Sequence, residues 1–409
     1  MLLTILSWTK YLRTICPKTD DPNKYTKLRK NNRLKVDEKV DPYMDTIIMK
    51  TDEAGAIEKA SEILNAGGLV AFPTETVYGL GGNALDASAA SRIYAAKGRP
   101  SDNPLIVHIA DTKDVYKLAE EVPEMAETLM EAFWPGPLTI IFKKKALVPD
   151  TTTGGLPTVA IRMPSHPGAY ELIRESGVYI AAPSANLSGK PSPTTAQHVI
   201  EDMSGRIDMI LDGGAVGLGL ESTIVDVTGD HPVILRPGFI TRKMLEELIG
   251  PGEIDPALIK PDKNLRPKAP GMKYTHYAPS GDLSIVESAS GTADDTVINK
   301  INVLAREALE AGKSVAILTT KEHRDSYSVS LSNDNRTDGH EGSLKSAQVI
   351  LLGSRSEGAT VASRLYAALR ECDEKGIEVI YCESFRDNEL SGAIMNRLLR
   401  AAGHKVITV

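Results

Sequence analysis

Apolar and polar positions follow helical and strand spacings in turn along most of the chain. Helical spacing of the apolar residues predicts helices at residues 57–64, 86–97, 114–132, 167–175 and 194–203. Short apolar runs between them predict strands at residues 69–72, 105–109, 138–142, 158–162, 178–182, 207–211, 223–227 and 233–235. Because strands outnumber helices late in this stretch, the pattern favours an α/β domain with a mixed sheet over a purely parallel one.

A second α/β pattern begins at residue 282. It predicts strands at residues 283–287, 314–319, 349–352 and 379–383, and helices at residues 294–311, 360–375 and 392–402. This order is typical of a smaller, doubly wound, Rossmann-like fold with three layers. Residues 332–335 within it are all turn formers, which predicts an exposed loop.

Two segments lack such periodicity. Residues 1–45 are basic and irregular, which is typical of a disordered extension, although an RNA-binding arm fits the same pattern. Residues 250–281 are interrupted by prolines and are longer than most structureless loops, so we interpret them as a linker that is either flexible or functional. These segments leave one α/β domain at residues 46–249 and a second at residues 282–409.

Composition narrows the class of protein. The 409 residues are 42% hydrophobic and 25% charged, as in ordinary globular proteins, and no apolar run approaches the roughly 20 residues of a membrane helix. The net charge of −7 argues against a surface that grips nucleic acid throughout, although a local basic groove remains compatible. The three cysteines show no paired spacing, so we expect a soluble protein in a reducing, cytoplasmic setting.

Small polar and cationic residues gather at the predicted ends of strands and helices. Three polar loops, at residues 72–80, 97–104 and 184–189, each follow an apolar element. Guanidinium groups bind phosphate in a bidentate manner, and short hydroxyls and amides add hydrogen bonds without bulk, so the set suits a triphosphate. The residues are Lys97, Arg99, Arg162, Arg236, Ser184, Asn186, Ser192 and Ser222.

Some polar residues fit a plainer interpretation equally well. Each arginine alone is also compatible with a surface ion pair. His108, within an apolar strand, is typical of a satisfied core histidine, and Glu75 and Glu221 are compatible with solvated carboxylates that contact magnesium at most through water.

Several ordered motifs together resemble the YrdC-like threonylcarbamoyl-AMP synthases. They are Gly-Gly-Leu-Val-Ala-Phe-Pro-Thr-Glu-Thr-Val-Tyr-Gly-Leu at residues 67–80, Lys-Gly-Arg-Pro-Ser-Asp-Asn-Pro-Leu-Ile-Val-His at 97–108, Trp-Pro-Gly-Pro-Leu-Thr at 134–139, Ala-Pro-Ser-Ala-Asn-Leu-Ser-Gly at 182–189 and Glu-Ser-Thr-Ile-Val at 221–225. Residues 269–279 resemble the linker of the two-domain members of this family. In the family, that linker folds back over the active site.

The resemblance implies a nucleotidyltransferase reaction. L-threonine, bicarbonate and ATP would give L-threonylcarbamoyladenylate and pyrophosphate, with Mg²⁺ held mainly by the ATP phosphates. The product would pass to a tRNA threonylcarbamoyl transferase complex, for threonylcarbamoyladenosine modification of tRNA next to the anticodon. Transfer to phosphorus needs alignment and charge neutralisation rather than a protein nucleophile, and the chain offers cations but no evident activated Ser or Cys.

The resemblance also implies roles for individual residues. Threonine would be bound by Thr76, His108, Arg162, Ala182 and Ser222. ATP would be bound by Arg99, Asn103, Thr158, Ser184, Ser192, Arg236 and the linker residue Tyr274. The catalytic group around the phosphates would be Lys97, Arg99, Ser184 and Asn186, and the apolar half of the pocket would come from Tyr78, Leu80 and Pro183.

Two other functions compete with this one. A module that binds double-stranded RNA, or regulates translation, could use a concave basic surface of the same fold and would contact RNA mainly through its backbone. A carbamoyl-phosphate-dependent maturation factor shares the YrdC-like domain, but it would carry zinc-finger segments, and the Cys-x-x-Cys spacing they need is absent from the sequence.

Overall fold

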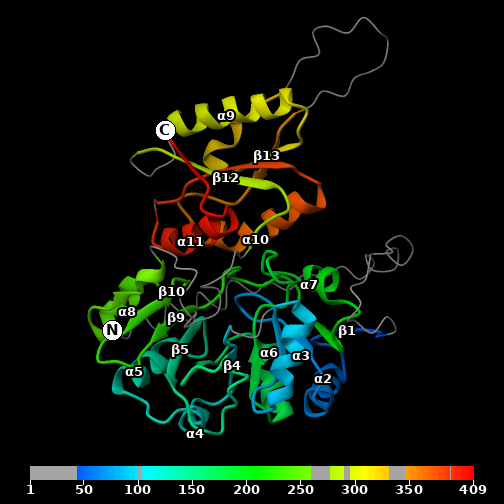
Figure 1. Ribbon diagram of the computed structural model, residues 1–409, viewed down its shortest axis with the longest axis vertical. Helices are drawn as coiled ribbons and strands as arrows, with labels where there is room; N and C mark the ends of the chain where they lie inside the picture. Colours follow the sequence, from blue (N-terminus) through cyan, green and yellow to red (C-terminus); the bar gives the residue numbers. More distant parts are fainter. Residues whose placement is uncertain (1–43, 100–102, 259–276, 290–294, 331–345, 387) are drawn as a thin grey trace, which may run out of the picture.

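The computed structural model describes residues 44–99, 103–258, 277–289, 295–330, 346–386 and 388–409. Its strands form two sheets, one of eleven strands within residues 47–254 and one of five within residues 282–408. We call these parts the N-terminal body and the C-terminal body. Figure 1 shows them stacked along the long axis of the molecule, with helices α10 (Gly358–Glu374) and α11 (Ser391–Ala401) of the C-terminal body facing the N-terminal body.

The larger sheet is mixed, as the strand-rich pattern predicts. Its order is β1-β8-β2-β3-β7-β4-β6-β5-β9-β10-β11. The strands are β1 (Ile47–Lys50), β2 (Val70–Phe72), β3 (Gly79–Asn83), β4 (Ile106–His108), β5 (Leu138–Lys143), β6 (Thr158–Arg162), β7 (Ile180–Ala182), β8 (Met209–Asp212), β9 (Thr223–Asp226), β10 (Val233–Arg236) and β11 (Glu253–Ile254). At the centre, β4 and β6 run parallel with His108 opposite Arg162, so the last residues of both strands meet at one edge.

Amphipathic helices surround this sheet. They are α2 (Ala56–Asn65), α3 (Ala87–Lys97), α4 (Val115–Leu118), α5 (Glu124–Phe133), α6 (Pro167–Ser176), α7 (Ala196–Met203) and α8 (Arg242–Ile249). Helix α3 begins after Asp86, whose side chain accepts a hydrogen bond from Ser88 N, and ends at Gly98 with φ of 62°. Only a left-handed residue ends a helix in this way without strain, and glycine adopts that conformation readily. The cap fixes where Lys97, the last residue of α3, lies.

The C-terminal body is a doubly wound parallel sheet, as predicted. The strands β12 (Asp282–Glu287), β13 (Val315–Thr319), β14 (Gln348–Leu351), β15 (Val379–Glu383) and β16 (Val406–Thr408) lie in the order β14-β13-β15-β12-β16. All their pairings are parallel. Helix α9 (Asp295–Glu310) packs on one face of the sheet, and α10 and α11 pack on the other, which gives three layers.

The single helix predicted over residues 114–132 is wrong. The chain instead forms α4, a break and then α5, which begins after Pro123. Proline has no amide hydrogen and disfavours the helical conformation of the residue before it, so a new helix starts there instead of continuing the previous one.

The apolar pattern also fails to predict several elements that the structure contains, namely β1, β3, α8, β11 and β16. Strand β3 is glycine-rich because its neighbours lie close. A Cβ at Gly81 would stand 2.6 Å from the Ile180 side chain, so the packing excludes the β-branched residues by which strands are usually identified.

Some predictions lie outside the described residues. The basic segment at 1–45 is described only from residue 44, and the predicted loop at 332–335 and most of the predicted linker, residues 259–276, are not described. Over the part of the chain that is described, no helix is long and apolar enough to span a membrane.

Loss of the α3 cap should lower stability. Asp86 Oδ1 accepts hydrogen bonds from both the amide and the hydroxyl of Ser88, at 2.8 and 2.7 Å, so Asp86→Ala leaves an amide of the first turn without its acceptor. We expect a loss of about 1 kcal/mol in the free energy of unfolding, measured by urea denaturation. Asp230→Ala, at an exposed turn position, is the control and should leave the midpoint unchanged.

Candidate active site

A cavity opens beside the central strands of the N-terminal body. Its wall combines the loop after β2, the end of α3, strand β4, the end of β6 and the loop after β7 with three residues from later in the chain. The residues that line it are Thr74, Thr76, Val77, Tyr78, Gly79, Lys97, Arg99, Ile106, His108, Arg162, Ala182, Pro183, Ser184, Asn186, Ser188, Gly189, Glu221, Arg236 and Tyr277. All three polar loops noted in the sequence therefore converge on one cavity.

Lys97 clamps one wall of the cavity. Its ammonium donates hydrogen bonds to the backbone oxygens of Ser184 and Asn186, at 2.5 and 2.6 Å, and lies 3.3 Å from Asn186 Oδ1. Burial, together with the neighbouring charge of Arg99, lowers the pKa of Lys97 well below its ordinary value. Because the ammonium protons already have acceptors on the loop at 184–189, Lys97 fixes the shape of that loop.

The same loop is closed by its own side chains. Ser184 Oγ donates to Asn186 Oδ1 at 2.5 Å. The Asn186 amide nitrogen donates to the backbone oxygens of Leu187 and Lys190, at 2.9 and 2.8 Å. A loop with this many internal hydrogen bonds is arranged before any ligand arrives, which lowers the entropic cost of binding.

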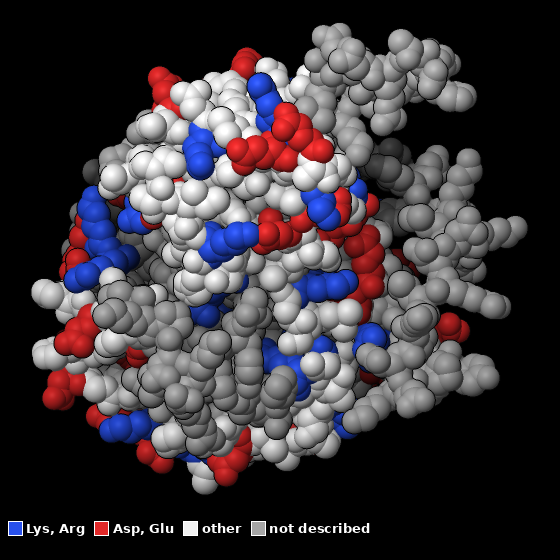
Figure 2. Space-filling model, turned by 45° about the horizontal axis from the view of Figure 1, so that its top comes forward, with Lys and Arg blue, Asp and Glu red and all other residues white. Residues whose placement is uncertain are grey.

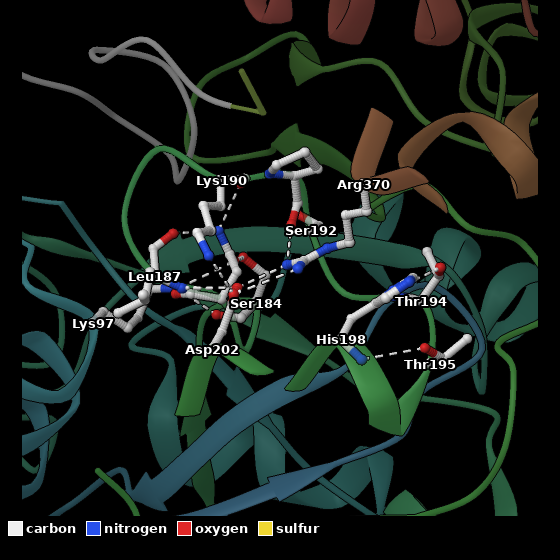
Figure 3. Close-up of polar contacts among 12 residues, drawn as sticks. Lys97, Ser184, Leu187, Lys190, Ser192, Thr194, Thr195, His198, Asp202 and Arg370 are labelled. Atoms are coloured by element: carbon white, nitrogen blue, oxygen red, sulfur yellow. Dashed lines mark hydrogen bonds and ion pairs between the residues drawn. The ribbon is translucent and has the colours of Figure 1, made fainter. Parts of the chain in front are cut away.

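Asp202 of α7 supports this loop from behind (Figure 3). Its carboxylate accepts hydrogen bonds from Leu187 N at 3.3 Å, Lys190 Nζ at 3.0 Å and the Arg370 guanidinium at 2.8 Å. Burial alone raises the pKa of Asp202, but Arg370 and Lys190 outweigh it and lower the pKa. Arg370 comes from α10 and also donates to the backbone oxygen of Pro191 at 2.6 Å, so the C-terminal body contacts the loop directly.

Asn103 presents buried polar atoms with no hydrogen-bond partner among the residues that the structure describes. The residue is fully buried, and neither its side-chain nitrogen nor its oxygen has a hydrogen-bond partner among the described residues. Its backbone oxygen accepts a hydrogen bond from Tyr94 Oη at 2.7 Å, which holds its position. A buried amide left in this state costs about 1–3 kcal/mol, so such a group indicates a bound ligand or water.

At another part of the wall, Arg162 and Glu75 form a buried ion pair. Their closest atoms, Arg162 Nη2 and Glu75 Oε1, lie 2.7 Å apart. Ser165 N donates to the second carboxylate oxygen at 3.2 Å, and Arg162 Nε donates to Gly136 O at 3.3 Å. The guanidinium is thus held in one orientation at the end of β6.

His108 is buried in the core, as one interpretation of the sequence expects, and it also lines the cavity. Its Nδ1 lies 3.1 Å from Ile106 O and 3.3 Å from Ile180 O. Both neighbours are acceptors, so Nδ1 carries the hydrogen and Nε2 keeps the lone pair. Burial, followed by the charge of Arg162, lowers the pKa of His108 to about 3. The imidazole is therefore neutral at pH 7.

Glu221 is the centre of a second buried cluster. Ser192 Oγ donates to its Oε1 at 2.6 Å, and Arg397 Nε donates to its Oε2 at 2.9 Å. Burial alone raises the pKa of Glu221, but the charges of Arg397 and Arg236 and the Ser192 hydroxyl bring it down to about 2. The interpretation of Glu221 and Glu75 as solvated carboxylates is wrong, because each is buried against an arginine.

Arg236 joins this cluster to the strand β9. Its guanidinium donates to the backbone oxygen and to Oγ of Ser222, both at 3.0 Å. Burial lowers the pKa of Arg236 to about 10, partly offset by Glu221, so the group stays charged at pH 7. A fixed positive charge therefore faces the cavity from this wall.

The structure places most predicted site residues in this one cavity. Those that line it are Lys97, Arg99, Ser184, Asn186, Thr76, His108, Arg162, Ala182 and Arg236, with Tyr78 and Pro183 from the apolar set. Ser192 and Ser222 lie one contact behind, on Glu221 and Arg236 respectively.

The remaining predicted residues lie elsewhere. Asn103 precedes β4, and Thr158 is the first residue of β6, which runs parallel to β4. Both residues therefore lie at the amino-terminal end of these two strands. Leu80 is buried in the core and does not line the cavity. Tyr274 lies outside the described residues.

Sequence reasoning missed the residues that act as partners of the predicted ones. Glu75, Glu221 and Tyr277 line the cavity, and Arg370 and Arg397 reach its wall from the C-terminal body. No spacing rule pairs residues so far apart along the chain. The sequence offers one signal for two of them. Glu75 lies beside Thr76 and Glu221 lies beside Ser222, and both of these neighbours were predicted to be site residues.

The described residues show no ready-made metal centre. They contain no group of three or more His, Cys, Asp or Glu side chains arranged to hold a metal ion. Both carboxylates at the cavity are already paired with arginines.

The comparisons with known proteins agree with the motifs. Residues 62–238 match the family described as "Telomere recombination", and residues 240–403 match "Threonylcarbamoyl-AMP synthase, C-terminal domain". A threonylcarbamoyl-AMP synthase of Bacillus subtilis (strain 168) is 50% identical over 353 residues, which cover 86% of this chain and 94% of the relative. The chain belongs to the two-domain threonylcarbamoyl-AMP synthase family. The resemblance inferred from the motifs is thereby confirmed.

A second relative and its solved structure match most of the chain. The threonylcarbamoyl-AMP synthase of Pyrococcus abyssi is 45% identical over 357 residues, covering 87% of this chain and 97% of that one. The solved structure of P. abyssi Sua5 complexed with L-threonine aligns with a TM-score of 0.78 at 44% identity, and covers 89% of this chain and 99% of the other. The fold of both bodies is therefore shared with a solved relative.

The buried neutral His108 should make the stability of this synthase family member depend on pH. In the unfolded chain a histidine titrates near 6.5, and in the folded protein the pKa is about 3. Between these pH values the His108 side chain binds more protons in the unfolded chain than in the folded protein. Its contribution to the free energy of unfolding is therefore constant above about pH 6.5 and falls as the pH drops. His198, whose pKa burial lowers to about 4, adds to the same trend.

His108→Gln should therefore flatten this dependence. We expect the slope of unfolding free energy against pH, measured by urea denaturation between pH 7.5 and 5, to decrease by up to about 1.4 kcal/mol per pH unit. His231→Gln, at an exposed turn position, should keep the wild-type slope. An unchanged slope in His108→Gln would contradict a buried neutral imidazole.

Proposed function

We propose that the protein is an L-threonylcarbamoyladenylate synthase, a nucleotidyltransferase that converts L-threonine, bicarbonate and ATP to L-threonylcarbamoyladenylate and pyrophosphate. The observation that carries this proposal is a single cavity lined by two different sets of polar side chains. A fixed arginine and a neutral histidine stand on one part of it, and further cations with small polar groups stand on another. Relatives that span most of the chain and are named for this activity support it.

We propose that threonine occupies the part of the cavity near Arg162. The threonine complex of P. abyssi Sua5 supports binding of this substrate. The Arg162 guanidinium, oriented by Glu75, suits the amino-acid carboxylate. The lone pair on His108 Nε2 can accept a hydrogen bond from the threonine hydroxyl or amine. Thr76, Ala182 and, through Arg236, Ser222 would complete the pocket.

ATP would occupy the part near Arg99 and Arg236. The side-chain amide of Asn103, which has no partner among the described residues, offers a donor and an acceptor at the same end of the strands as Thr158. Lys97, Ser184 and Asn186 would present a rigid loop to the phosphates, with Ser192 supporting Glu221 behind. Such preorganised donors stabilise developing charge without reorganisation during the reaction.

The reaction needs no protein nucleophile. The threonine amine, after losing a proton, adds to bicarbonate to form a carbamate and water. A carbamate oxygen then bonds to the α-phosphorus of ATP while the bond from that phosphorus to the bridging oxygen breaks and releases pyrophosphate. The protein contributes alignment of the two reactants and positive charge around the phosphates.

Magnesium fits this scheme as a companion of the nucleotide. Glu75 and Glu221 are each neutralised by an arginine, so we propose that the ion is bound chiefly by phosphate oxygens, as is usual for Mg²⁺ at nucleotide sites. We further propose that the product goes to a transferase complex that modifies the adenosine next to the tRNA anticodon.

Direct contact with double-stranded RNA gains no particular support. Figure 2 shows a face on which Lys and Arg side chains are interspersed with Asp and Glu among the described residues, rather than gathered in one basic surface. Backbone recognition of RNA requires such a gathering of positive charge.

Removal of the Arg99 charge should abolish most turnover. We expect Arg99→Ala to reduce pyrophosphate release from ATP, in the presence of Mg²⁺, bicarbonate and L-threonine, by about 10²-fold or more. The matched control is Arg242→Ala, an exposed arginine paired with Glu246, which should keep wild-type turnover. Release by the wild type that is independent of threonine or of bicarbonate would overturn the proposed reaction.

Arg162→Lys should act selectively on threonine. Lysine keeps the charge but loses the planar fork that binds a carboxylate with two hydrogen bonds. We expect the KM for threonine to rise by about tenfold or more, while the KM for ATP changes less than twofold, in steady-state assays of pyrophosphate release. An equal rise in both constants would place the arginine outside the threonine site.

A further inference from the structure

The C-terminal body supplies buried polar side chains to the wall of the cavity. Tyr366 and Arg370 of α10 and Arg397 of α11 are at most 5% exposed, and all three point toward the N-terminal body. Burying such groups is costly unless each has partners. The partners of these three side chains therefore indicate what the contact between the two bodies does.

Tyr366 and Arg397 converge on one carboxylate. Tyr366 Oη lies 3.0 and 2.9 Å from the two carboxylate oxygens of Glu221, and Arg397 Nε donates to Oε2 at 2.9 Å. Arg397 also donates to Glu221 O at 3.3 Å and to Pro237 O at 2.6 Å. Backbone and side chain of Glu221 are thus both held by the C-terminal body.

The other contacts of Glu221 lead into the cavity. Its Oε1 accepts the hydrogen bond from Ser192 Oγ at 2.6 Å, and the next residue in the chain, Ser222, accepts two hydrogen bonds from Arg236, which lines the cavity. Tyr366 also packs against the ring of Tyr277, another lining residue, with ring centroids 5.0 Å apart. A shift of Glu221 would therefore move a hydroxyl and a positive charge on the side assigned above to ATP.

We propose that Tyr366 and Arg397 are positioning residues for the ATP side of the cavity, acting through Glu221. This inference rests on the proposed synthase function and adds to it a role for two named residues of the C-terminal body. Glu221 transmits their position to Ser192 and Arg236, and neither residue needs to touch a substrate.

A second, separate contact points the same way. Arg370 holds Asp202 at 2.8 Å and Pro191 O at 2.6 Å, and Asp202 in turn holds Leu187 N at 3.3 Å (Figure 3). The segment between Leu187 and Pro191 continues the loop of Ser184 and leads to Ser192. Both flanks of this segment are therefore fixed to α10.

The threonine side offers a built-in contrast. Among the described residues, the polar contacts of Arg162, Glu75 and His108 come from the N-terminal body alone. Loosening the Glu221 cluster should consequently affect ATP much more than threonine, which the cluster reaches only through the contact between Arg236 and Ser222. A general loss of stability would not discriminate between the two substrates in this way.

Tyr366→Phe in the full-length chain tests the proposal. It removes only the hydroxyl that contacts Glu221 and keeps the ring that packs on Tyr277. We expect the KM for ATP in pyrophosphate release, and the Kd for ATP by calorimetry, to rise about five- to tenfold, with less than a twofold change in the KM for threonine.

The matched control is Tyr327→Phe. Tyr327 Oη donates to the buried carboxylate of Glu383 at 2.8 Å within the C-terminal body, so the variant suffers the same chemical change away from the cavity and should keep both wild-type constants. Arg397→Lys should recover part of the ATP affinity that Arg397→Met loses, because only the lysine can still donate to Glu221.

Three results would overturn the inference. They are an ATP constant within twofold of wild type in Tyr366→Phe, an equal rise for both substrates in that variant, or the same ATP defect in Tyr327→Phe. If the wild type binds ATP but releases no pyrophosphate with threonine, the proposed reaction fails, and the calorimetric comparison still decides the positioning role. A wild type that binds no ATP overturns both.

Discussion

Burial of charge is the constraint on which the site depends. A charged side chain out of water is tolerated only where partners replace its hydration, and the cavity wall contains several such groups. Lys97 is satisfied by backbone oxygens, Arg162 by Glu75, and Glu221 by arginines on two sides. Each pairing also fixes the positions of the two paired groups. The partners that make buried charge tolerable therefore also make the cavity wall rigid. A rigid polar wall is what alignment of two substrates demands.

The fold could be predicted from the sequence wherever burial on one face leaves a periodic trace. Strand β6 and the parallel sheet of the C-terminal body follow directly from apolar runs and their alternation with helices. The pattern fails where tertiary packing replaces it. In β3 close packing against Ile180 selects glycine, and between α4 and α5 a proline ends a periodicity that the apolar residues alone would continue.

The site could be predicted only as far as its residues carry local motifs. Lys97, Arg99, Ser184 and Asn186 lie in short polar loops after apolar elements, and the structure brings them to one cavity. Their partners could not be found in this way. In the sequence Glu75 is compatible with a solvated carboxylate, because its partner Arg162 lies 87 positions further along the chain. Whether a carboxylate is paired becomes evident only in the folded chain.

The contact between the two bodies extends this argument to the domain level. Glu221 and Arg397 are 176 residues apart and belong to different bodies, yet they form a buried ion pair. Such a pair adds little net stability over well-packed apolar residues, because desolvation consumes most of the attraction. Apolar contacts between the bodies, such as those of Val77 and Leu220 with the core of the C-terminal body, hold them together with less cost. What an ion pair adds is a defined geometry, since hydrogen bonds fix direction as well as distance. Because Glu221 lines the cavity and accepts a hydrogen bond from Ser192, the pair places that geometry where the nucleotide is proposed to bind. The C-terminal body can therefore shape the site through Tyr366 and Arg397, neither of which lines the cavity.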